Sequence, residues 1–136
     1  MSTPLPIDAC VPAPGQGIIA VEIRRDDTRL RRLVGTIDDA STAAALTAER
    51  ALVERLGGGC QMPIGGYARI EHDTIRIIGI VISLDGARVV RAEATGSTND
   101  PSAAGIAAAT RLLEDGAEAI LAEARAGASA VEGLQP

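Results

Sequence analysis

The stretch from residue 66 to residue 95 constrains the fold most, because its hydrophobic residues recur with a period of two. Residues 74–82 (TIRIIGIVI) are apolar on both sides, as in a central strand, whereas the run before them alternates with polar side chains. The Asp85-Gly86 pair is a strong hairpin turn. The sequence therefore predicts three antiparallel strands, at 66–72, 74–82 and 87–95.

The residues before this stretch follow the helical period instead. Hydrophobic side chains at helical spacing fall on one face of a predicted helix over 42–56. Ser41 or Thr42 can cap the start of this helix, and Asp38 and Asp39 just before it are further candidate caps. Gly57 supplies a left-handed stop at its end. The predicted face consists of Ala45, Ala48, Leu52 and Leu56, while Glu49, Arg50 and Glu54 are expected to lie largely away from it.

Helical spacing returns after the third strand. Asp100-Pro101 indicates an N-cap followed by proline at the first helical position. Gly116 divides the pattern into two helices, and a weak tail is expected from Gly127. The order of helix, three strands and helices predicts a small α+β fold. The apolar face predicted for these two helices consists of Ile106, Ala109, Leu113, Ala117, Ile120 and Ala124.

The first 37 residues fit this layer poorly. Four prolines in residues 1–15 favour an extended segment that nothing fixes in place. The apolar run 17–23 (GIIAVEI) predicts a buried strand, and an arginine-rich helix is expected over 26–34. We expect the strand to lack sheet partners within this chain and to promote self-association as an exposed edge.

Composition excludes several classes of protein. Phe and Trp are absent and Tyr67 is the only aromatic residue, so aliphatic side chains must fill the core. A net charge of -5, with no basic stripe and no set of stacking rings, argues against nucleic-acid binding. No apolar run is long enough to span a membrane, and the start lacks a signal-peptide pattern. We therefore expect a cytoplasmic protein in which Cys10 and Cys60 are reduced thiols.

Cys60 is the most informative residue, because it lies between three glycines and Gln-Met-Pro. A catalytic thiol needs a nearby histidine, but Cys60 follows a helix C-terminus and the single histidine, His72, falls in a turn. The spacing of Cys10, Cys60 and His72 matches no zinc site, so no metal is predicted. A buried structural cysteine is one alternative. A covalently held group is another, since the glycines would let the backbone approach something bulky.

Two stretches, PAPGQGIIAVEIR (12–24) and TAERALVERLGGGCQMPIGGYA (47–68), resemble the C-terminal part of the hydroxymethylbilane synthase, or porphobilinogen deaminase, family. The resemblance extends from about Pro12 to about Gly127. It implies a transferase of porphyrin and heme biosynthesis, which joins four porphobilinogen molecules into linear hydroxymethylbilane with loss of ammonia.

The resemblance also assigns roles to particular residues. It implies that Cys60 holds a dipyrromethane cofactor through a thioether. Gln16 and Gly17 match the family's Gly-Gln-Gly turn, where they could contact a pyrrole carboxylate. No catalytic residue is predicted in this chain, because the family's catalytic aspartate and main carboxylate-binding residues belong to two domains without a counterpart here.

The same resemblance divides the chain in two. Residues 1–37 are expected to be a crossover segment between the family's second and first domains, and residues 38–136 the cofactor-anchoring third domain. The chain is then expected to be a fragment that lacks activity of its own. Three explanations stay open: a truncated gene model, a trimmed form of the protein, or one half of a split enzyme that pairs with the missing domains as a separate chain. The alternative is a non-catalytic α+β remnant or a complementing subunit.

Overall fold

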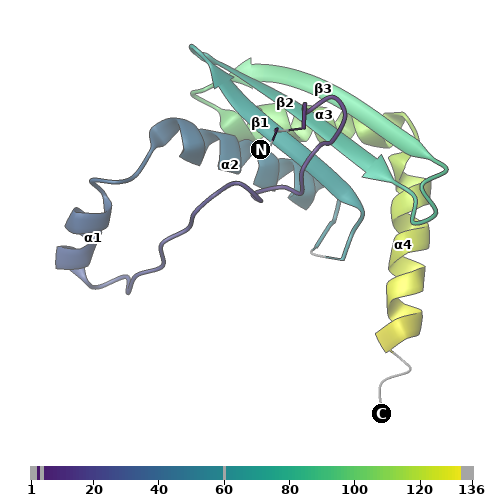
Figure 1. Ribbon diagram of the computed structural model, residues 1–136, viewed down its shortest axis with the longest axis horizontal. Coiled ribbons are helices and arrows are strands. Elements are labelled where there is room, and N and C mark those ends of the chain that lie inside the picture. The colour runs from purple at the N-terminus through teal and green to yellow at the C-terminus, as the bar shows by residue number, and fades with distance from the viewer. Residues whose placement is uncertain (1–2, 4, 60, 133–136) are drawn as a thin grey trace.

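A computed structural model of the chain describes residues 3, 5–59 and 61–132, with side chains as far as Gly127. The chain folds as a three-stranded antiparallel sheet with helices, which confirms the predicted α+β class (Figure 1). In chain order the elements are α1 (Thr28–Val34), α2 (Ala40–Arg55), β1 (Ile64–Glu71), β2 (Thr74–Ile82), β3 (Val89–Ser97), α3 (Pro101–Glu114) and α4 (Ala117–Glu132).

The sheet has the order β1-β2-β3, so the most apolar strand is the central one, as predicted. Helices α2 and α3 cover one face, and the segment around Ile7 and Asp8 lies across the other (Figure 1). The turn between β1 and β2 places His72 at a φ of 58°, a left-handed conformation that is uncommon for a residue with a side chain. We refer to α2, the sheet, α3 and α4 together as the core domain.

The core is built from small and aliphatic side chains, as the lack of Phe and Trp requires. Leu52 of α2 and Leu112 of α3 are fully buried beneath β2. Where these two helices meet, a Cβ on Gly105 would collide with the carbonyl oxygen of Ala48. Most of the predicted helix faces are buried, although Ile106 is exposed and Ala45 and Leu113 are only half-buried.

Local signals placed most helix ends correctly. Asp100 caps α3 with Pro101 in its first turn, and Gly57 and Gly116 adopt positive φ after α2 and α3. Two ends differ from the prediction. Helix α4 continues past Gly127 to Glu132 rather than giving way to a tail.

The start of α2 also differs. Asp39, one of the candidate caps, is the N-cap in place of Ser41 or Thr42, because its carboxylate accepts a hydrogen bond from the Thr42 backbone N–H at 2.7 Å. The helix therefore begins at Ala40.

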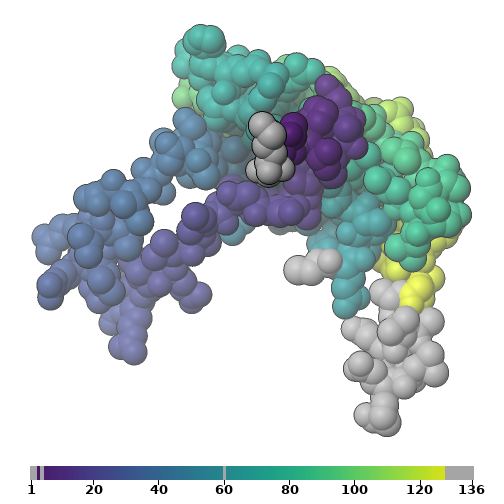
Figure 2. Space-filling view, viewed as in Figure 1, coloured from purple at the N-terminus to yellow at the C-terminus, as the bar shows by residue number. Residues whose placement is uncertain are grey.

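The predicted strand over 17–23 is wrong. This segment is irregular, because no other strand among the described residues offers it a backbone partner. Ile19 is 92% exposed, and α1, which agrees with the predicted helix, buries none of its residues. Residues 17–37 project from the rest of the molecule and are called the apolar arm (Figure 2).

The expectation that nothing fixes residues 1–15 is also wrong. Residues 5–16, here called the strap, are tied to the core domain at three points. Arg91 of β3 pairs with Asp8 at 2.9 Å, Gly66 of β1 donates to the Pro12 carbonyl at 2.9 Å, and Gly15 donates to a side chain of α2. The division of the chain at residues 37 and 38 stays a prediction.

Within the part of the chain that the structure describes, no helix is both long enough and apolar enough to cross a membrane.

Candidate functional site

The loop that leads to Cys60 begins where α2 ends. Cys60 itself lies outside the described residues, so its predicted role rests on the sequence. Gly57 ends the helix with a φ of 63°, and the Gly58 N–H donates to the Val53 carbonyl at 3.0 Å. A Cβ built on Gly59 would meet nothing within 4 Å. The loop thus turns away from the helix and leaves open space around the residue that precedes Cys60.

Gly65 and Gly66, the glycines after Cys60, let the strap lie close to the backbone of β1. A Cβ on Gly65 would lie 3.2 Å from the Val11 carbonyl oxygen, and one on Gly66 would lie 3.2 Å from the Pro14 ring. Larger residues here would push the strap away from β1. The strap therefore packs on the start of β1, directly after residues 56–63, which we call the Cys60 loop.

Gln16 and Gly17 follow the strap's contact with the core domain. The Gln16 side chain accepts a hydrogen bond from the Ala13 N–H at 3.1 Å and so closes its own turn. Both residues are exposed and border a depression of about 180 Å³ that also touches Tyr67 and Ala68. Contact between Gln16 or Gly17 and a pyrrole carboxylate stays a prediction.

Glu49 of α2 is the polar residue that joins this helix to the strap and to β1. Its side chain is 5% exposed, whereas the helical period had placed it largely away from the buried face. One carboxylate oxygen accepts from the Gly15 N–H at 2.7 Å, and the other accepts from the Ala68 N–H at 2.8 Å. These bonds explain the burial, because both oxygens have partners. No local pattern could have revealed it, since both donors are distant in sequence.

A groove of about 510 Å³ runs along α2, between this helix and residues 14–20, which form the end of the strap and the start of the apolar arm. Arg50 and Glu54 lie on it, and its far end reaches Gly58, two residues before Cys60 in the sequence. Aliphatic side chains dominate the rest, which suits flat aromatic rings, and the guanidinium of Arg50 suits a carboxylate. The apolar lining consists of Pro14, Ile18, Ala20, Leu46 and Val53.

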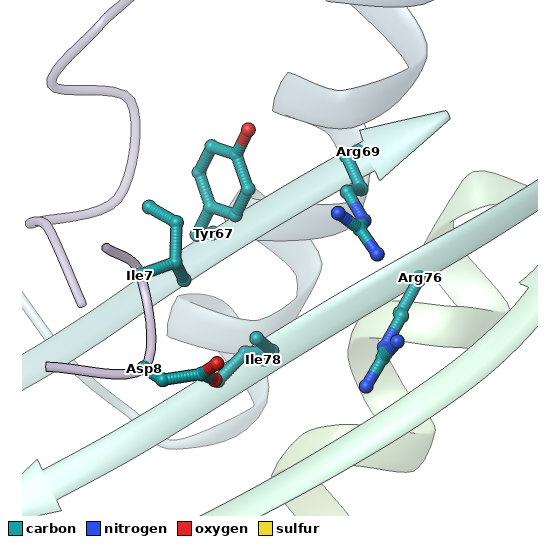
Figure 3. A pocket seen from close by; sticks show the side chains of 6 residues that line it. All are labelled: Ile7, Asp8, Tyr67, Arg69, Arg76 and Ile78. Atoms are coloured by element: carbon teal, nitrogen blue, oxygen red, sulfur yellow. The ribbon is translucent and has the colours of Figure 1, made fainter. Parts of the chain in front are cut away.

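The outer face of the sheet carries a smaller hollow of about 110 Å³, which Tyr67, Arg69 and Arg76 line together with Ile7 and Asp8 of the strap (Figure 3). Its arginines already have partners. Arg69 pairs with Glu71 at 2.5 Å, and Arg76 donates to Glu93 at 2.6 Å. This face is therefore less suited to an added anion than the groove.

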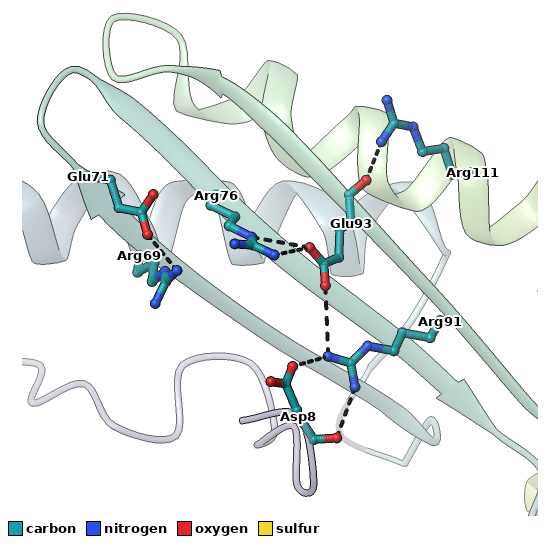
Figure 4. A network of polar contacts seen from close by, with 7 residues as sticks. All are labelled: Asp8, Arg69, Glu71, Arg76, Arg91, Glu93 and Arg111. Carbon is teal, nitrogen blue, oxygen red and sulfur yellow. Dashed lines mark hydrogen bonds and ion pairs between the residues drawn. The ribbon is translucent and has the colours of Figure 1, made fainter. Parts of the chain in front are cut away.

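Apart from the Arg69–Glu71 pair, the charges drawn on this face form a connected network (Figure 4). Its centre is Glu93, whose carboxylate accepts from Arg76 and raises the pKa of that guanidinium. Arg91 lies 3.8 Å from the other oxygen of Glu93 and 2.9 Å from Asp8 of the strap. Because these pairs are substantially exposed, each contributes little stability by itself.

Comparison with known proteins agrees with the resemblance seen in the sequence. The family model described as "Porphobilinogen deaminase, C-terminal domain" matches residues 43–114, from α2 to the end of α3. The chain belongs to this family. The matched region includes Glu49, the α2 wall of the groove and the Cys60 loop.

Individual relatives extend the match. Porphobilinogen deaminase of Carboxydothermus hydrogenoformans is 47% identical over 121 residues, which are 89% of this chain and 39% of that protein. Porphobilinogen deaminase of Moorella thermoacetica is 46% identical over 133 residues, which are 98% of this chain and 42% of that protein. The chain thus spans about two fifths of the length of these curated relatives.

Proposed function

We propose that this chain is the cofactor-anchoring part of an enzyme that condenses porphobilinogen into linear hydroxymethylbilane. The observation that carries the proposal is the groove along α2, which ends at Gly58 beside the Cys60 loop. In this proposal Cys60 holds a dipyrromethane through a thioether. When bound, the dipyrromethane supplies the pyrrole carbon from which the product chain grows.

The residues of the groove would bind and orient pyrrole rings. Aliphatic side chains of α2, such as Leu46 and Val53, would pack on the rings and keep water from that side. The guanidinium of Arg50 would bind a carboxylate of the cofactor or of a pyrrole intermediate.

The carboxylates near the groove do not supply an obvious proton donor. Both oxygens of Glu49 already accept backbone hydrogen bonds, and Glu54 is exposed on the helix surface. We therefore assign the proton transfers to the part of the relatives that this chain does not cover. As a consequence, we expect no turnover of porphobilinogen by this chain alone.

A complementation experiment tests the proposal. The chain is mixed with a separately expressed piece that contains the remaining portion of a relative, and hydroxymethylbilane formation is measured. We expect activity only in the mixture, loss of that activity with Cys60→Ser, and retention with the control Cys10→Ser, because Cys10 is an exposed thiol of the strap. Turnover by the isolated chain would contradict the assignment of the chemistry.

A further inference from the structure

We propose that Glu49 is a positioning residue, which fixes the turn formed by residues 15–17 between α2 and the edge of the sheet. The proposal rests on the proposed function only in treating this turn and the adjoining groove as parts of the binding site. The hydrogen bonds themselves do not depend on it.

The edge of β1 requires such a residue. β1 pairs with β2 on one side only, so alternate N–H groups on its other side need acceptors. The Gly66 N–H donates to the Pro12 carbonyl of the strap, and the next N–H on that side, from Ala68, donates to Glu49 at 2.8 Å. The strap and Glu49 therefore complete the same edge.

Proline explains why the strap does not complete the edge by itself. Pro12 and Pro14 lack backbone N–H groups, so this segment cannot form a regular ladder with β1. Glu49 supplies the hydrogen-bond acceptor that a paired strand would otherwise offer to β1. One of its oxygens binds the sheet through Ala68, and the other binds the Gly15 N–H at 2.7 Å, directly before Gln16.

The two donors also explain why a glutamate is needed. Each N–H requires an oxygen acceptor, and a glutamine of the same size would offer one oxygen and one N–H₂ group, which cannot accept. The side chain lines both the groove along α2 and the depression beside Gln16. Loss of one bond should therefore release the turn and alter both hollows.

Amide hydrogen exchange measured by NMR on the full chain tests this role. Glu49→Gln leaves one accepting oxygen for two donors, so we expect the amide of either Gly15 or Ala68 to exchange on the order of tenfold faster, since its bond to a charged acceptor is lost. The amide resonances of residues 15–17 should shift, while exchange at Ile77 in the central strand should not change. Glu54→Gln, a change of an exposed glutamate on the same helix, is the matched control and should leave Gly15 unaffected.

Two outcomes would overturn the proposal. Unchanged protection of both Gly15 and Ala68 in Glu49→Gln would show that other contacts hold the turn, and equal acceleration at Ile77 would show that Glu49 only supports the fold. If Glu49→Gln does not fold, the unaltered chain still provides a test. Its Gly15 amide, which is bonded to Glu49, must exchange more slowly than the amide of Gly17 in the same turn. These measurements do not require a loaded Cys60, so failure of the proposed function would leave their result intact.

Discussion

The core domain and the apolar arm contain similar aliphatic side chains, but they bury them to very different extents. Leu52 and Leu112 of the core domain are fully buried, whereas Ile19 of the arm is 92% exposed and Ile37 is 72% exposed. The difference arises because α2 and α3 pack on a sheet, while the arm has no second layer among the described residues. An apolar sequence thus indicates that a segment has a surface to bury, but it does not indicate which other segment will cover that surface.

The largest expected effect comes from truncating one side chain in each region. Leu52→Ala should lower the free energy of unfolding by about 3 kcal/mol, because it leaves a cavity beneath β2. Ile19→Ala should change it by less than about 0.5 kcal/mol, because this side chain is already exposed. Urea denaturation measures both values. Equal losses would show that the arm packs on the core domain in solution.

A second comparison uses two helical glycines. Gly105→Ala should destabilise the fold by about 2 kcal/mol, because the added methyl group collides with the Ala48 carbonyl and separates α2 from α3. Gly127→Ala should stabilise it by up to about 1 kcal/mol, since nothing lies within 4 Å and alanine favours the helix. Thermal unfolding of both variants checks this pair. A tolerated alanine at position 105 would contradict the close packing of the two helices.

Removal of residues 1–37 deletes the strap together with the arm, and we expect the loss of stability to come from the strap. We expect residues 38–136 to unfold cooperatively, but with a free energy of unfolding lower by roughly 2 kcal/mol, because the strap's bonds to Gly66 and Glu49 are lost. Denaturation curves of the two proteins give the difference. An unchanged midpoint would mean that the docked strap adds no stability.

The smallest effect concerns the cap of α2. The hydrogen bond from the Thr42 backbone N–H lowers the pKa of Asp39 below its ordinary value. Asp39 therefore adds stability above the pKa that it has when unfolded, and this stability is lost as the pH falls through its lower folded value. Asp39→Ala should lower the melting temperature at neutral pH, whereas Asp39→Asn should retain most of the cap. A difference between the wild type and Asp39→Ala that persists in strong acid would contradict a role for the ionised side chain.

The sequence predicted those features that depend on neighbouring residues. The bounds of β2, the cap at Asp100 and the stop at Gly57 each follow from a local pattern, and the structure confirms them. Burial of Glu49 and docking of the strap were missed, because their partners lie far away in the sequence. The strand over 17–23 was predicted from its apolar residues, but a strand forms only where a neighbour completes its hydrogen bonds.

The position of the cofactor gives the most direct test of the proposed function. After the chain is reconstituted with the remaining portion of a relative and supplied with porphobilinogen, trypsin should separate the two cysteines into peptides 1–24 and 56–69. Mass spectrometry should find a dipyrromethane adduct on peptide 56–69 alone, and Cys60→Ser should abolish it. An adduct on peptide 1–24, which contains Cys10, or one that survives Cys60→Ser would contradict the assignment of Cys60 as the anchor.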